Sequence, residues 1–220
     1  MKSLSLVIPA YGSGDLLGGI LAHIQDLKKV AGRCGFELGE AIVVDDGSEP
    51  PIAVDSSRLC VPLVMLRNPR NRGKGYSVRR GALSARGGWV LMSDADESAP
   101  LTEFAELAPF ADRAVVCGSR RCGRDARPFV RRVLSVVFNA LTGTGLKDTQ
   151  CGFKLFNMEL MRPVLESLRT ERFAFDVELV RKAPSVAEVP VSWHGGKRST
   201  LRVWRDAPRM LWDLIRIRLF

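Results

Sequence analysis

The sequence contains few cysteines, and their positions show no pairing pattern. There are five, an odd number, and no two of them are spaced as in a CxxC motif. Such a set argues against a disulfide framework and against a structural zinc site, because both need paired cysteines. We therefore expect reduced thiols in a cytoplasmic protein.

Long apolar runs are also missing. A membrane-spanning helix needs about 20 consecutive apolar residues, and no stretch of this sequence approaches that length. The first predicted strand begins at Leu4, without the basic and apolar segments of a cleavable signal. We expect a soluble or peripheral membrane protein. Histidine is scarce as well, and the sequence shows no ligand partners for His23 or His194, which we interpret as structural residues.

The composition is that of a basic globular protein. Of its 220 residues, 46% are hydrophobic and 26% are charged, enough to bury a core within one domain with a small appended element. The formal net charge of +9 predicts an anionic partner. Nucleic acid, an acidic membrane surface and a phosphorylated substrate all fit this charge, and composition alone leaves the three open.

Short apolar runs alternate with segments of helical periodicity. We expect strands at residues 4–9, 41–44, 61–66, 89–92 and 114–117, and helices at 15–30, 75–85 and 101–110. Because the expected strands are apolar on both faces, the fold class should be α/β, a mostly parallel sheet flanked by helices. Ligands bind such sheets outside the carboxyl ends of the strands.

Polar residues follow four of these strands, which predicts that they meet at one edge of the sheet. The segments are PAY (9–11), DDGS (45–48), SDAD (93–96) and GSR (118–120). In the third, only the small residue Ala95 separates Asp94 from Asp96, so both carboxylates can face one divalent cation. Mg²⁺ and Mn²⁺ prefer such oxygen ligands, and a diphosphate is their usual companion. A solvated acidic turn is the alternative.

Glycines after the first strand suggest a second alternative, a dinucleotide site. Gly12, Gly14 and Gly18 have the spacing GxGxxxG, which departs from the GxGxxG of that motif. A dinucleotide-binding enzyme also has no need of a second acidic pair at the sheet edge. We interpret the glycines as a flexible turn.

Several motifs, in this order, resemble those of family-2 inverting glycosyltransferases with a GT-A fold. They are LVIPAY (6–11), VVDDGS (43–48), NRGKG (71–75) and DAD (94–96). The second half resembles the polyprenyl-phosphate hexosyltransferases, the dolichyl-phosphate glucose and mannose synthases, in DTQCGFK (148–154), FAFDVE (173–178) and VPV (189–191). The DTQCGFK motif is more similar to the glucose branch than to the mannose branch. The resemblance covers nearly the whole chain.

The resemblance implies a metal-dependent hexosyltransferase. It would move a hexose to a polyprenyl or dolichyl phosphate. The favoured donor is UDP-glucose, and GDP-mannose is the alternative. Asp94 and Asp96 would hold Mg²⁺ or Mn²⁺. In the mannose synthases, a glutamine two residues after the second aspartate resembles a third metal ligand. This chain has Ser98 at that position, so water or Glu97 would complete the metal shell. A different class of protein, a non-catalytic nucleotide-sugar-binding subunit of a membrane complex, remains an alternative.

The resemblance also implies donor contacts from four strand or helix ends. The donor-binding residues would be Pro9, Tyr11, Asp45, Asp46, Gly73, Lys74, Asp94 and Ala95. The backbone donors of a helix start and a lysine suit a diphosphate. Two alternatives stay open: the acidic pair at 45–46 could cap a turn, and the GKG segment could be a plain helix start with a solvated lysine.

The acceptor implied by the family is a lipid monophosphate. Its second pKa of about 6 leaves it largely dianionic at neutral pH, so it needs cationic positioning and no general base. The candidate acceptor-binding residues are Arg120, Arg131, Arg132, Lys197 and Arg202. The residues expected to act in catalysis are Asp96, Arg120, Arg131 and Gln150. Asp148 should lie near the same groups, whereas Asp176 and Glu178 could orient basic residues or cap a helix.

Two segments suggest a membrane surface. Residues 129–142 have the pattern of an amphipathic helix, or equally of a core helix. Residues 197–220 hold seven basic and two acidic residues, a net +5 of the chain's +9, beside Trp204 and Trp212. Anionic headgroups attract each such charge by about 1 kcal/mol, and tryptophan favours the interface. We therefore expect a catalytic domain at 1–196 and a membrane-surface segment at 197–220.

The expected partners follow from these segments. They are a nucleotide-sugar donor, a polyprenyl-phosphate acceptor, an anionic membrane surface and a separate integral membrane partner, since the related enzymes often carry transmembrane helices after the catalytic domain. Nucleic acid is not expected, because no motif for it is present. The location would be cytoplasmic and peripheral, at the inner face of the membrane.

Overall fold

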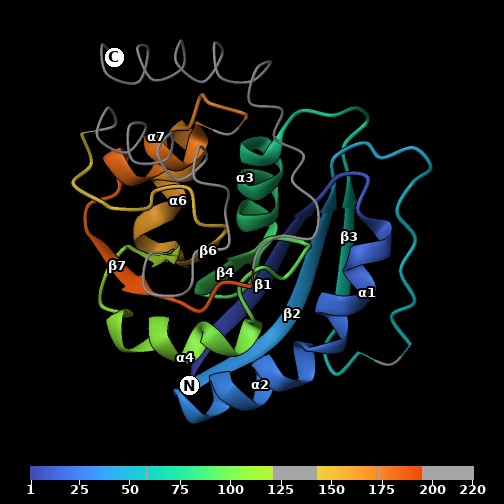
Figure 1. The fold of residues 1–220 in the computed structure, drawn as a ribbon, viewed down its shortest axis with the longest axis horizontal. Helices are drawn as coiled ribbons and strands as arrows, with labels where there is room; N and C mark the ends of the chain where they lie inside the picture. The colour runs from blue at the N-terminus through green and yellow to red at the C-terminus, as the bar shows by residue number, and fades with distance from the viewer. Residues whose placement is uncertain (58, 121–142, 173, 195–220) are drawn as a thin grey trace.

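A computed structural model describes residues 1–57, 59–120, 143–172 and 174–194 of the chain (Figure 1). The expected amphipathic helix at 129–142 and the expected membrane-surface segment at 197–220 lie outside the described residues. So do four of the candidate acceptor-binding residues, namely Arg131, Arg132, Lys197 and Arg202.

In the described part of the chain, seven strands form one sheet, in the order β3-β2-β1-β4-β6-β5-β7. The strands are β1 (Lys2–Ala10), β2 (Phe36–Asp45), β3 (Leu63–Arg67), β4 (Trp89–Ser93), β5 (Val115–Ser119), β6 (Phe153–Asn157) and β7 (Val186–Pro190). Only β6 runs antiparallel to its neighbours, and the other pairs are parallel. The predicted mostly parallel sheet is confirmed.

Helices cover both faces of the sheet (Figure 1). α1 (Gly14–Ala22), α2 (Ile24–Arg33) and α4 (Phe104–Leu107) contribute to one apolar cluster, and α3 (Lys74–Ser84), α6 (Met158–Ser167) and α7 (Phe175–Lys182) contribute to the other. Side chains of β1 alternate between the two clusters, Leu6 and Ile8 in the first and Val7 in the second. Because side chains of a strand alternate with a period of two, an apolar strand fills both layers.

Two predicted helices differ in detail from the structure. The segment expected as one helix at 15–30 is two helices, which meet at His23. The segment expected at 101–110 is a short α4 between the 3₁₀ turns η1 (Leu101–Glu103) and η2 (Ala108–Phe110). Pro109 lies at the start of η2 and has no backbone N–H to donate, which interrupts the regular α-helical pattern.

The strand β6 was not predicted, nor were the helices that follow it. It lies between β4 and β5, and Lys154 interrupts its apolar residues. A lysine in a five-residue segment hides the strand pattern from a sequence analysis. The described part of the chain contains no helix long and apolar enough to cross a membrane.

Candidate active site

The site lies at the carboxyl edge of the parallel strands. β1 pairs with β2 and with β4 in parallel, so that Ala10, Asp45 and Ser93 end their strands on the same side of the sheet. The backbone N–H of Asp46 donates to the carbonyl of Ala10 across 2.8 Å and continues this pairing past the strand ends. The predicted meeting of polar strand ends is confirmed. Pro9 is partly buried there, and Tyr11 is 46% exposed.

The Asp94–Asp96 turn follows β4 directly. The backbone N–H of Asp94 donates to the carbonyl of Gly152, 3.1 Å away, which ties the turn to the start of β6. Asp96 Oδ1 accepts from Ser98 through both the backbone N–H, at 3.1 Å, and the hydroxyl, at 2.7 Å. Ser98 therefore supports the second carboxylate. Ala95, between the two acids, is buried.

The two carboxylates offer the oxygen donors that a hard divalent cation prefers. Among the described residues, no group of three or more His, Cys, Asp and Glu side chains is arranged to hold a metal. The pair at 94 and 96 thus fits a cation that takes its remaining ligands from the oxygens of a bound ligand or from water, as Mg²⁺ commonly does.

Two histidines hold the same turn from other elements. His23, at the junction of α1 and α2, lies with its Nδ1 2.7 Å from Oε2 of Glu97. The backbone N–H of His194 donates to the carbonyl of Ser98 across 2.9 Å. Glu97 has a φ of 48°, a conformation that few residues other than glycine adopt. One oxygen of its carboxylate, Oε2, is engaged by His23. Water and Glu97 both stay alternatives for the third metal ligand.

A glycine allows the close approach of β6 to the turn. A Cβ atom on Gly152 would lie 1.8 Å from Oδ2 of Asp94. No side chain fits in that space, so the glycine of the DTQCGFK motif is required by the position of the Asp94 carboxylate. Gln150, two residues earlier, is partly buried in the same loop.

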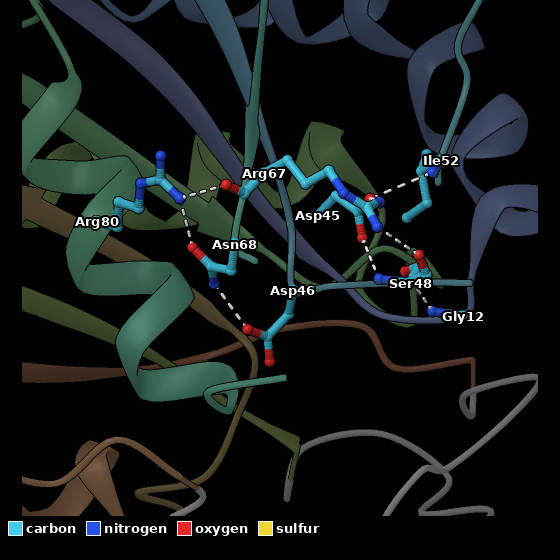
Figure 2. Close-up of polar contacts among 8 residues, drawn as sticks. All are labelled: Gly12, Asp45, Asp46, Ser48, Ile52, Arg67, Asn68 and Arg80. Atoms are coloured by element: carbon cyan, nitrogen blue, oxygen red, sulfur yellow. Dashed lines mark hydrogen bonds and ion pairs between the residues drawn. The ribbon is translucent and has the colours of Figure 1, made fainter. Parts of the chain in front are cut away.

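Asp45 connects the ends of three strands (Figure 2). Its Oδ1 accepts from the backbone N–H of Ser48 at 2.8 Å, and its Oδ2 accepts from Ile52 N at 3.2 Å and from Arg67 Nη1. The Ser48 hydroxyl in turn accepts the N–H of Gly12, 2.9 Å away. Burial alone would raise the pKa of Asp45, but the hydrogen bonds from Ser48 and Ile52 and the Arg67 charge lower it below its usual value.

Asp46 shapes the loop that leads to α3, and Figure 2 shows its contact with Asn68. Its Oδ1 accepts from Asn68 Nδ2 at 2.7 Å and from the N–H of Arg72 at 2.9 Å, and its Oδ2 accepts from the N–H of Gly73 at 2.7 Å. Arg80 donates to Asn68 Oδ1 and so fixes the amide. These contacts anchor the start of α3.

Both acids of this pair are nearly inaccessible, Asp45 with 2% and Asp46 with 3% of its surface exposed. Their contacts are those of the alternative in which the pair shapes a turn. Hydrogen bonds from Asp45 and Asp46 to a donor nucleotide stay a prediction.

The GKG segment places a lysine beside the acidic turn. Lys74 Nζ lies 2.6 Å from Asp94 Oδ1, and the two side chains are 18% and 30% exposed. Gly73, with a φ of 107°, precedes the helix, and a Cβ atom on Gly75 would lie 2.5 Å from the Cβ of Phe175. The glycines thus let α3 start against α7, and the lysine is not solvated as in a plain helix start.

Arg120 forms a two-pronged ion pair with Asp148. Arg120 Nε and Nη2 each lie 2.6 Å from one oxygen of that carboxylate, and the guanidinium lies 5.1 Å from the Trp193 ring centre. Burial alone would lower the pKa of Arg120, but the hydrogen bond and charge of Asp148 raise it above its usual value. Arg120 is therefore a fixed cation at the end of β5, and its contact with an acceptor stays a prediction.

A second ion pair is fully buried behind the site. Lys154 Nζ donates to Asp176 Oδ1 at 2.6 Å and to the carbonyl of Cys151 at 2.5 Å. Burial alone would lower the pKa of Lys154, but Asp176 raises it, so the lysine stays charged. The FAFDVE motif thus supplies the partner of the DTQCGFK lysine. Its Glu178 accepts the backbone N–H groups of Arg169 and Thr170 in the preceding loop and pairs with Lys182 Nζ at 2.7 Å, so it orients a basic residue and does not cap α7.

Comparison with known proteins identifies the family. The model of glycosyl transferase family 2 matches residues 5–168. A dolichyl-phosphate beta-glucosyltransferase of Dictyostelium discoideum is 34% identical over 98% of this chain and 73% of its own length. The Homo sapiens protein of that name is 33% identical over 99% of this chain and 75% of its own length. The Saccharomyces cerevisiae protein is 32% identical over 98% of this chain and 74% of its own length. This chain belongs to glycosyl transferase family 2 and, within it, to the dolichyl-phosphate beta-glucosyltransferase family.

Solved structures share the fold at lower identity. Glucosyl-3-phosphoglycerate synthase from Mycobacterium tuberculosis, in complex with Mn²⁺ and UDP-glucose, is 16% identical with a TM-score of 0.67, over 97% of this chain and 79% of that one. Mannosyl-3-phosphoglycerate synthase from Rubrobacter xylanophilus is 20% identical with a TM-score of 0.66, over 98% and 72%. The predicted GT-A fold is confirmed, and the dinucleotide alternative is disfavoured.

Proposed function

We propose that this chain transfers glucose from UDP-glucose to a polyprenyl or dolichyl phosphate, with inversion at the sugar carbon. The observation that carries the proposal is the 32% to 34% identity, over nearly the whole chain, to proteins named dolichyl-phosphate beta-glucosyltransferase. The structural neighbour with UDP-glucose and Mn²⁺ supports the choice of donor and a divalent metal.

Asp94 and Asp96 would hold the cation, Mg²⁺ or Mn²⁺. A bound cation would offset the negative charge that grows on the departing diphosphate as the sugar bond breaks. The paired carboxylates at the end of β4 and the hydroxyl of Ser98, which supports Asp96, favour this role.

The donor would lie along the carboxyl edge of β1, β2 and β4. Lys74 and the backbone N–H groups at the start of α3 would bind the diphosphate, because a helix start favours anions. The exposed ring of Tyr11, with Pro9 before it, would stack on the base. Ala95 would pass close to the donor through its backbone. Asp45 and Asp46 would act chiefly by holding the strand ends and the start of α3 in place.

The acceptor phosphate would arrive as a dianion and attack the sugar carbon without help from a base. Among the described residues, Arg120 would orient it, and Gln150 would lie near the donor sugar. Arg131, Arg132, Lys197 and Arg202, outside the described residues, would supply further positive charge. Since a phosphate dianion is already a nucleophile, positioning is the main task of these residues.

A transfer assay tests this function. The purified chain is incubated with a short polyprenyl phosphate, Mg²⁺ or Mn²⁺, and a panel of UDP-glucose, GDP-mannose and other nucleotide sugars. We expect glucosyl-lipid from UDP-glucose at a rate above that with any other donor. Mannosyl-lipid from GDP-mannose would support the mannosyltransferase alternative instead. Transfer to lipid from none of the donors would contradict the proposal and favour a non-catalytic binding subunit.

Residues 1–196 would form the catalytic domain, and residues 197–220 would hold it on the membrane. The net charge of +5 in that segment, beside two tryptophans, supports a peripheral location at the cytoplasmic, inner face. A separate integral membrane protein would be an additional partner.

Vesicle binding checks the membrane proposal. We expect the full chain to sediment with vesicles that contain anionic lipid, and less so as salt rises, because salt screens the attraction between basic residues and headgroups. Vesicles of neutral phosphatidylcholine are the control and should retain little protein. Failure to sediment with anionic vesicles, at low as well as moderate salt, would refute the idea.

A further inference from the structure

The acidic turn already has a positive partner in the protein. Asp94, one of the two carboxylates assigned to the metal, lies with its Oδ1 2.6 Å from the ammonium of Lys74. Lys74 is at the same time the residue assigned to the donor diphosphate. Lys74 therefore contacts a carboxylate assigned to the cation and is itself assigned to the donor diphosphate.

Both members of this pair are held by the backbone. Asp46 accepts the N–H groups of Arg72 and Gly73 and so fixes the residues immediately before Lys74. On the other side, Asp94 donates its own N–H to Gly152. The lysine and the carboxylate thus face each other because of contacts from other segments.

A divalent cation and an ammonium group compete for one carboxylate. Two cations that share Asp94 repel each other, so the cation binds better when Lys74 moves away from the carboxylate. Asp176 is another carboxylate in electrostatic contact with Lys74. That carboxylate is already bound to Lys154 at 2.6 Å, so it offers Lys74 only a weaker alternative.

We infer that Lys74 competes with the divalent cation for Asp94, and that the donor diphosphate relieves this competition by binding Lys74. The inference rests on the proposed function for the identity of the donor. In the absence of donor the cation binds weakly. When a diphosphate is present, Lys74 has a new partner, and the cation and donor bind together more tightly than either binds alone. Such coupling is reciprocal, since each ligand must raise the affinity of the other by the same factor.

Mn²⁺ binding tests the inference without any catalytic turnover. Free Mn²⁺ is measured by electron paramagnetic resonance as it is titrated into the full chain, with and without saturating UDP. In the wild type we expect UDP to raise Mn²⁺ affinity by about fivefold or more. In Lys74→Met, we expect Mn²⁺ to bind more tightly than to the wild type in the absence of UDP. The enhancement by UDP should be smaller than in the wild type, because only the part that the diphosphate oxygens supply as metal ligands remains.

Two further variants separate competition from a general charge effect. Lys29→Met also removes one lysine that faces an aspartate, the exposed pair with Asp26 on α2, and should leave Mn²⁺ affinity close to the wild-type value. Lys74→Arg keeps the positive charge and should keep weak Mn²⁺ binding in the absence of UDP. Thermal unfolding of each variant confirms that it is folded.

The inference is overturned if Lys74→Met binds Mn²⁺ no more tightly than the wild type without UDP, or if UDP leaves the Mn²⁺ affinity of the wild type unchanged. The second result is measured on the wild type, so the inference can be tested even if Lys74→Met does not fold. Failure of the proposed function gives a different result, namely no sugar transfer to lipid in the donor panel while the coupling between UDP and Mn²⁺ persists.

Discussion

Replacement of Asp96 by alanine is expected to lower the rate of glucose transfer to a polyprenyl phosphate by on the order of 10²–10³-fold. The carboxylate lies at the end of β4, where Ser98 donates two hydrogen bonds to it, and it is one of the two acids that would hold the cation. Without it, the charge that develops on the departing diphosphate loses a large part of its compensation. The initial rate with UDP-glucose, short polyprenyl phosphate and saturating Mn²⁺ measures the effect.

Asp112→Ala is the matched control for this variant. Asp112 is an exposed acid that pairs only with its neighbour Arg113 among the ion pairs of the described residues, and its loss should leave the transfer rate within about twofold of the wild type. Circular dichroism shows whether both variants are folded. A folded Asp96→Ala protein that transfers glucose as fast as Asp112→Ala would disprove the metal role of the turn.

Replacement of Lys154 by methionine should cost about 3–5 kcal/mol of unfolding free energy. Lys154 is fully buried in β6, and its ammonium compensates the buried carboxylate of Asp176. The methionine fills similar space but leaves that carboxylate without a counter-ion inside the protein, where an unpaired charge is poorly solvated. Urea unfolding, followed by circular dichroism, measures the loss.

A double variant distinguishes the lost charge from a lost shape. Lys154→Met together with Asp176→Leu removes both charges and should recover most of the stability, because apolar residues can replace a buried ion pair. As a surface control, Lys29→Met breaks the exposed pair with Asp26 and should cost about 1 kcal/mol or less. If the double variant is no more stable than Lys154→Met alone, the unpaired-charge explanation is incorrect.

The strand ends show how much the sequence could predict. The runs before Tyr11, Asp46 and Asp94 are apolar on both faces, which indicates strands of a parallel sheet, and parallel strands end on the same edge. From these local patterns alone, the fold class and the edge at which the polar strand ends meet were predicted, and the structure confirms both. The basic and glycine residues at 73–75 were likewise assigned to a helix start, where the structure places them.

The contacts inside the site could not be predicted in this way. Three pairs of side chains join residues from separate elements, so no spacing rule connects them. They are Lys74 with Asp94, His23 with Glu97, and Arg120 with Asp148. The strand β6 could not be predicted either. Its buried Lys154 depends on a partner from a distant element, Asp176 on α7.

Local sequence thus determined the kind of fold and the edge where its chemistry-bearing residues gather, since hydrophobic period and strand ends depend on neighbours in the chain. Tertiary structure alone decided which charges are paired. It placed Lys74 on Asp94 and turned Asp45 and Asp46 inward to hold strand and helix ends, because such pairing depends on the distance between side chains brought together by the sheet.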